Sequence, residues 1–183
     1  SGASSSATAA ADAFDADLLA GLAPRSIGPA GMSGRIAAIA AVESNPDIVY
    51  AGAATGGVWK SFDGGVTWKP IFDDQPVAAI GAIAIDRRNP SIVWVGTGEG
   101  NVRNSASVGN GIYRSLDGGE SWTHLGLDGS ERIHRIVLHP DDSEVAWVAA
   151  LGREWGENPE RGIFKTTDGG RTWSRYAWSC CSK

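Results

Sequence analysis

Three aspartates stand at matching places in a phrase that the sequence repeats: Asp63, Asp117 and Asp168. Each is followed by two glycines and, shortly afterwards, by a tryptophan. A carboxylate in this setting could ligate a metal, act as a general acid or base, or accept hydrogen bonds from the amides of a tight turn. Because Asp-Gly-Gly tolerates positive φ, the pattern favours the turn. Three copies of one catalytic aspartate would instead require three separate active sites.

We therefore assign a structural role to the aspartate, the second glycine and the tryptophan of each phrase. These residues are Asp63, Gly65, Trp68, Asp117, Gly119, Trp122, Asp168, Gly170 and Trp173.

The repeat extends beyond the phrase, because the aspartates lie 117−63 = 54 and 168−117 = 51 residues apart. A period near fifty residues is typical of stacked or radially arranged units. In each unit, short apolar runs separated by Asn, Pro, Asp and Gly predict four antiparallel strands. The units cover residues 34–72, 80–126 and 133–178. The sequence thus predicts an all-β chain, a β-propeller with three four-stranded blades.

Closed propellers have about four to eight blades, so we expect these three to be part of a larger propeller. Open sheet edges left by three blades would favour self-association.

The two ends differ in composition from the predicted blades, which occupy residues 22–178. Residues 1–21 begin with a run rich in Ser, Ala and Gly, which predicts a flexible leader, and they lack the charged start and apolar core of a signal peptide. Residues 179–183 form an atypical tail with adjacent Cys180 and Cys181. That spacing fits neither a zinc site nor a redox motif, so we interpret the tail as a truncation or an altered reading frame.

The composition excludes several classes of function. The formal net charge is −5 and the pI about 5.1, and the chain has no basic run that would predict a nucleic-acid partner. No apolar stretch is long enough for a membrane span. The three histidines lack ligand spacing and there is no phosphate-binding or dinucleotide fingerprint, so we expect no metal and no cofactor.

The repeated phrase, Ser/Thr-x-Asp-x-Gly-x-Thr-Trp, resembles the Asp-box, or BNR, repeat. The segments 25–29, 33–36, 56–60 and 96–99 look like the N-terminal blades of secreted bacterial BNR proteins of sortilin-N-terminal-like or glycosyl-hydrolase-like type. This resemblance implies a β-propeller and a secreted or periplasmic location. It does not choose among sialidases, xyloglucanases, sortilin-type receptors and assembly factors, because one fold serves many functions.

Binding residues are expected on the long loops between the second and third strands, which share one end of the blades with the blade-to-blade connections. The candidates on this loop face are Glu99, Asn101, Arg103, Arg153, Glu154 and Trp155. An indole beside carboxylate, guanidinium and amide groups suits stacking on a sugar and hydrogen bonds to its hydroxyls. The alternative is a set of solvated loops with internal Arg–Glu pairs.

Glycoside hydrolysis needs two carboxyl groups about 5 to 10 Å apart. The resemblance to xyloglucanases implies an acidic residue where this chain has Ala54, and Glu99 has no partner identifiable from the sequence. The sequence therefore predicts a non-catalytic recognition or scaffold propeller that binds a glycan, a peptide or a partner protein. The alternative is the N-terminal part of a secreted glycoside hydrolase whose catalytic acids lie mostly outside this chain.

Overall fold

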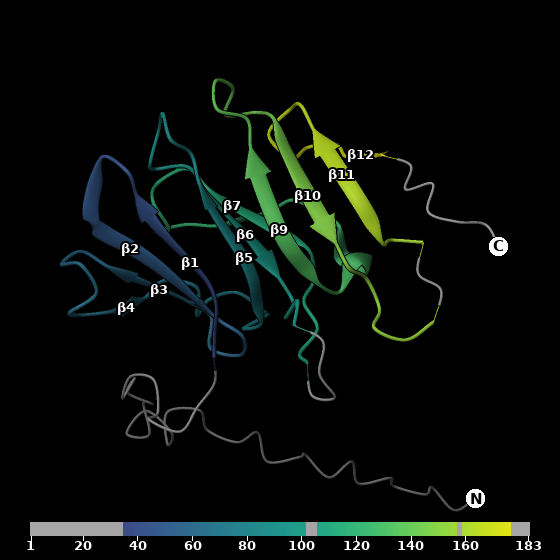
Figure 1. The fold of residues 1–183 in the computed structure, drawn as a ribbon, viewed down its shortest axis with the longest axis horizontal. Coiled ribbons are helices and arrows are strands. Elements are labelled where there is room, and N and C mark those ends of the chain that lie inside the picture. The colour runs from purple at the N-terminus through teal and green to yellow at the C-terminus, as the bar shows by residue number, and fades with distance from the viewer. Residues whose placement is uncertain (1–34, 102–105, 157–158, 177–183) are drawn as a thin grey trace, which may run out of the picture. The chain divides into compact units, whose positions relative to one another are not determined.

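The structure is a computed structural model that describes residues 35–101, 106–156 and 159–176. The predicted leader, Arg103 and the tail with Cys180 and Cys181 lie outside these residues. The described part of the chain folds into three four-stranded antiparallel sheets (Figure 1), which confirms the all-β prediction.

Each sheet takes its four strands in sequence order, so each is one blade. Blade 1 has β1 (Ile36–Val42), β2 (Asn45–Ala53), β3 (Val58–Ser61) and β4 (Lys69–Pro70). Blade 2 has β5 (Ile80–Ile85), β6 (Val93–Thr97), β7 (Ile112–Ser115) and β8 (Thr123–His124). A 3₁₀ turn, η2 (Asp128–Ser130), precedes blade 3, which has β9 (Ile133–Leu138), β10 (Ala146–Ala150), β11 (Gly162–Thr166) and β12 (Ser174–Tyr176).

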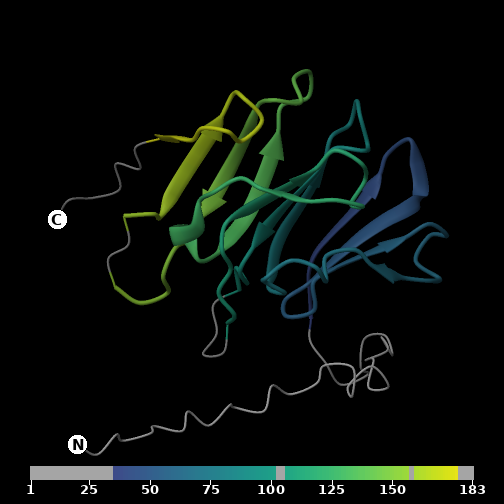
Figure 2. The same ribbon diagram turned by 180° about the vertical axis from the view of Figure 1, so that it is seen from behind.

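The first strands of the blades lie next to one another, β1 beside β5 and β5 beside β9. The blades follow in order from blue to yellow when seen from either side (Figures 1 and 2). The turns joining β9 to β10 and β11 to β12 lie at the upper end of blade 3 in Figure 1, and the loop that leaves β10 lies at its lower end. The repeated phrases and the long loops therefore occupy opposite ends of a blade.

The apolar cores lie between blades rather than inside one. Between blades 1 and 2, Tyr50, Val58 and Phe72 pack with residues of blade 2, and the Phe72 and Tyr113 rings meet edge to face at 5.1 Å. A second core between blades 2 and 3 includes buried Trp94. Because a four-stranded sheet with two apolar faces cannot cover both by itself, each blade depends on its neighbours for burial.

In each Asp-box, the aspartate carboxylate accepts hydrogen bonds from other residues of the same box. Asp63 accepts hydrogen bonds from the Thr67 amide (2.8 Å), the Thr67 hydroxyl (2.6 Å) and the Ser61 hydroxyl (2.7 Å). The same bonds recur at Asp117 and Asp168. The Thr67 hydroxyl and amide, with the Ser61 hydroxyl, lower the pKa of Asp63 to about 2, because they bind the charged form of the carboxylate.

The Asp-box also joins two turns of one blade. Its first glycine donates its amide to a carbonyl in or just after the turn between the first and second strands. The distance is 2.9 Å from Gly64 to Asp47, near the start of β2, and 2.9 Å from Gly169 to Glu144, in the turn before β10. Both sets of turns are thereby fixed at the same end of the blades.

The tryptophan and the second glycine of a box contact the preceding blade. Trp173 donates its indole N–H to the carbonyl of Leu125 in blade 2, at 2.8 Å. A Cβ on Gly170 would lie 2.6 Å from a Leu125 methyl and 3.2 Å from the Trp94 ring. In blade 1, a Cβ on Gly65 would meet only its own Trp68, at 3.4 Å.

We predict that Gly170→Ala is more destabilising than Gly65→Ala. The backbone strain is shared, since φ is 92° at Gly170 and 96° at Gly65. Of the two glycines, only Gly170 has side chains of another blade so close that an added Cβ would clash with them. Its variant should therefore lose about 1 to 2 kcal/mol more in the free energy of unfolding. Urea denaturation of both variants measures the difference, and equal losses would contradict close packing of this box.

We also predict that the Asp-boxes contribute to acid unfolding. The pKa of Asp63 is about 2 in the folded chain and near the ordinary value of about 3.9 when unfolded, so its contribution is complete above pH 4 and lost as the pH falls towards 2. Asp63→Asn removes this titration. The melting temperature of that variant should fall less steeply between pH 4 and pH 2 than that of the wild type. Asp74→Asn, at an exposed position outside the boxes, is the control, and identical slopes for all three chains would refute the prediction.

Candidate functional site

The structure brings three of the predicted residues together. Arg153, Glu154 and Trp155 lie in the loop that leaves β10, and Asn101 is exposed in the loop that leaves β6. Arg103 lies outside the described residues.

Glu99 differs from the expectation of a surface ligand. Its side chain is completely buried, and both carboxylate oxygens bind the guanidinium of Arg35, which directly precedes β1. The Glu99 amide also donates to the carbonyl of Ser107 at 2.9 Å. Since Arg35 belongs to blade 1 and Glu99 to blade 2, this forked ion pair joins two blades at the loop end.

A cleft of about 310 Å³ opens on the loop face. It is built by the loop after β6, the connection that enters β9 and the loop after β10. Its lining residues are Gly100, Arg132, Leu151, Gly152, Arg153, Glu154, Trp155 and Arg161. Loops of two neighbouring blades thus contribute to one concave surface.

Two arginines hold the loop after β10 in place. Arg132 contacts Glu154 (3.4 Å) and donates to the carbonyl of Gly152 (3.3 Å). Arg161 donates to the carbonyls of Leu151 (2.8 Å) and Arg153 (2.7 Å). These contacts restrain residues 151–154 of the loop after β10, directly before Trp155.

The side chain that this framework leaves uncovered is Trp155, which is 79% exposed. Beside it, Arg153 pairs with Glu131 at 3.1 Å and keeps 68% of its side chain accessible. Within the described residues, Arg132 Nε and Glu154 Oε1 are buried without a hydrogen-bond partner. The cleft therefore offers a flat ring for stacking, surrounded by groups that can donate and accept hydrogen bonds.

Glu154, which lines the cleft, and Glu131, which lies beside it, are each paired with an arginine. Among the residues the structure describes, no group of three or more His, Cys, Asp or Glu side chains could hold a metal ion. The geometry of this cleft suits binding better than acid–base chemistry.

Sequence reasoning missed Arg35, Glu131, Arg132 and Arg161. Glu131 and Arg132 could have been identified as candidates, because they lie in a blade-to-blade connection and the predicted topology places such connections on the loop face. Their ion-pair partners could not be identified, because these depend on how neighbouring blades and loops approach one another.

A profile of the Sortilin-Vps10 family (sortilin, neurotensin receptor 3) matches residues 56–181, which is more than half of the chain. The comparison with curated proteins yields no match.

Solved structures of β-propellers are also similar. A GH74 enzyme from Niastella koreensis has 27% identity over 75% of this chain and 20% of that chain, with a TM-score of 0.57. An ancestral GH74 enzyme has 19% identity over 80% of this chain and 19% of that chain, with a TM-score of 0.64. YCF48 bound to D1 peptide has 16% identity over 78% of this chain and 40% of that chain, with a TM-score of 0.54.

The chain therefore spans about a fifth of each GH74 enzyme and two fifths of YCF48. These likenesses confirm the predicted partial β-propeller. The described residues include no helix with the length and apolar character needed to cross a bilayer.

We predict that the Arg35–Glu99 pair is strongly coupled. Arg35→Met leaves the Glu99 carboxylate buried without its counter-charge, which should cost about 3 kcal/mol of unfolding free energy. The double variant Arg35→Met/Glu99→Gln removes that charge and should recover part of the loss. Urea unfolding of the single and double variants gives the coupling energy, and simple additivity would show that the pair is not coupled.

Proposed function

The chain belongs to the Sortilin-Vps10 family, and from this membership we propose that it is a non-catalytic recognition propeller that binds its ligand at the cleft beside Trp155. The observation that carries the proposal is the 79% exposure of Trp155 on a loop whose carbonyls are bound by Arg132 and Arg161. Leaving an indole in water forfeits about 2 kcal/mol of burial, which a structural tryptophan would normally recover. Aromatic side chains presented by anchored loops are typical of binding sites.

The ligand is a glycan or a peptide. The Trp155 ring can stack on the apolar face of a sugar or pack on an apolar side chain, and both ligands display polar groups for Arg153 and Glu131. YCF48, which has the same fold, was solved bound to D1 peptide, and this supports the peptide as one of the two ligands to test.

A second candidate function rests on the 27% identity to a GH74 enzyme. In this alternative the chain forms the N-terminal part of a glycoside hydrolase, and its cleft binds part of the polysaccharide while the catalytic acids lie mostly in other blades. The arginine-paired state of Glu131 and Glu154 favours recognition over hydrolysis within this cleft.

We further propose a location outside the cytoplasm, on the basis of the sequence resemblance to secreted BNR proteins.

We predict that Trp155→Ala abolishes binding or weakens it at least about fivefold without unfolding the chain, since stacking on an aromatic ring contributes about 1 to 3 kcal/mol. A glycan array and a peptide library, each probed with wild type and variant, provide the measurement. Phe62→Ala is the matched control, because Phe62 is 55% exposed within the Asp-box of blade 1, at the opposite end of the blades.

Ligands that bind wild type and Trp155→Ala equally well would contradict the proposed site. Release of reducing ends from xyloglucan by the wild-type chain would instead support the hydrolase alternative and refute a purely recognitional role.

A further inference from the structure

The connection from β8 to β9 contains strained backbone. Among the residues that the structure describes, Leu127 and Glu131 are the only ones other than glycine with a positive φ. At Glu131 φ is 50° and ψ is −38°, and the Arg132 amide donates a hydrogen bond to the Ser130 carbonyl two residues earlier. This is a γ-turn with a positive central φ, a rare and strained conformation for a residue other than glycine. A glutamate at its centre therefore needs an explanation.

The passage from one blade to the next does not require this strain. The carbonyls of Glu131 and Arg132, just before β9, accept hydrogen bonds from amides of the loops after β6 and β10. The carbonyls of Ala78 and Ala79, at the same places before β5, accept the corresponding bonds from the loops after β2 and β6. The donors are Gly109 and Leu151 in the first case and Gly57 and Gly98 in the second. Since neither alanine has a positive φ, these bonds can form with a relaxed backbone.

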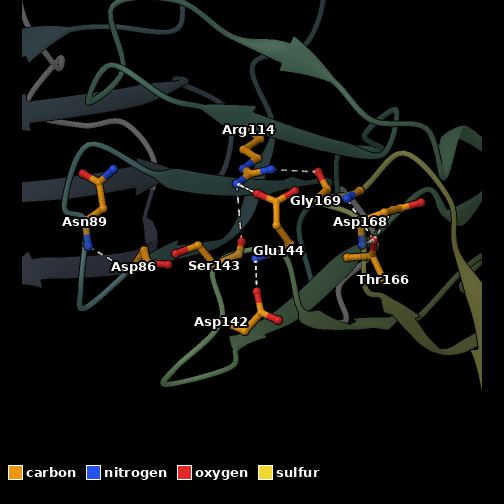
Figure 3. A network of polar contacts seen from close by, with 10 residues as sticks. Asp86, Asn89, Arg114, Asp142, Ser143, Glu144, Thr166, Asp168 and Gly169 are labelled. Carbon is orange, nitrogen blue, oxygen red and sulfur yellow. Dashed lines mark hydrogen bonds and ion pairs between the residues drawn. The ribbon is translucent and has the colours of Figure 1, made fainter.

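Blades 2 and 3 are also held together at their other end. Arg114 of β7 donates to the Gly169 carbonyl at 3.2 Å and to the Glu144 carboxylate at 2.7 Å, and both acceptors belong to blade 3 (Figure 3). These contacts lie at the Asp-box end of the interface, whereas Glu131 lies at the loop end. A relaxed backbone at Glu131 would therefore leave the two blades joined, and the interface alone does not explain the strain.

The strained turn places a carboxylate beside the cleft. Glu131 Oε1 accepts a hydrogen bond from Arg153 Nε at 3.1 Å, and the Arg153 side chain remains 68% accessible. Trp155, two residues further along the same loop, is 79% exposed. The hydrogen bond uses Nε and leaves the Nη groups of Arg153 for a ligand. A long side chain that is already restrained loses less conformational entropy when it binds.

We propose that Glu131 is a positioning residue of the cleft: its strained backbone places a carboxylate that holds the Arg153 guanidinium beside Trp155, where it can donate to an oxygen atom of the ligand. Glu131 acts through Arg153 and need not touch the ligand. The inference rests on the binding function proposed above, and it assigns the strain to binding, not to folding. Relief of the strain should therefore raise stability while affinity falls.

The first experiment compares alanine and glycine at this position by thermal unfolding, followed by circular dichroism. Glu131→Ala and Glu131→Gly both remove the carboxylate, so the difference between them reports the backbone. Glu131→Gly should melt at least about 2 °C above Glu131→Ala, because glycine adopts a positive φ without strain. Ala78→Gly is the matched control at the unstrained equivalent position, where glycine should lower the melting temperature relative to the wild type.

The second experiment measures binding of the same variants to the glycan array and the peptide library used for Trp155→Ala. Both Glu131 variants should bind about fivefold more weakly than the wild type, since an unrestrained Arg153 must be ordered on binding. Glu131→Gln keeps an acceptor for Arg153 Nε and should retain more of the affinity. In an Arg153→Met background, Glu131→Gly should cause no further loss, because Glu131 acts through that arginine.

The outcomes separate this inference from the proposed site. A Glu131→Gly variant that melts below Glu131→Ala would overturn the assignment of strain. Undiminished binding by Glu131→Gly, together with weakened binding by Trp155→Ala, would overturn the positioning role and leave the site intact. Wild-type binding that Trp155→Ala does not weaken, or no binding by the wild type to the array or the library, would overturn the site and this inference together.

Discussion

Contact between an Asp-box and the blade before it is the constraint on which this structure depends. A propeller blade is a short twisted sheet with apolar side chains on both faces, and its neighbours must supply the missing burial. The box allows the two blades to approach closely. Because Gly170 has no side chain, Leu125 of the preceding blade can pack against the turn, and Trp173 donates a hydrogen bond to the Leu125 carbonyl. This carbonyl is partly buried, and a fully buried one left without a donor would cost about 1 to 3 kcal/mol, so the indole both fills space and prevents part of that loss.

The same constraint separates structure from function along each blade. The Asp-box carboxylates are engaged by hydroxyl and amide donors, and their bonds hold the pKa of Asp63 and of Asp168 near 2. Groups that titrate so far below neutrality are poorly suited to proton transfer near pH 7. The end of the blades that carries the Asp-box turns thus has a structural role. The opposite end carries longer loops, which can vary in sequence without weakening the contacts between blades.

The fold could be predicted because its signal is local. Asp63 finds its partners within four residues, so the box is visible in the sequence wherever it occurs. The interactions that shape the candidate site are not local: Arg35 and Glu99 are 64 residues apart and lie in different blades. The sequence predicts a surface position for Glu99 because this residue begins a long polar loop. Its burial next to Arg35 depends on how two blades approach each other, which the order of residues in either blade does not reveal.

The sequence leaves ion-paired loops and a binding site as alternatives, and the structure indicates how they can coexist. Arg132 and Arg161 bind three loop carbonyls and Glu154, and they restrain residues 151–154, which directly precede Trp155. A mobile loop would lose conformational entropy on binding, whereas a restrained one has already lost it during folding. The arginine contacts therefore favour ligand binding by Trp155 even if they never touch the ligand themselves.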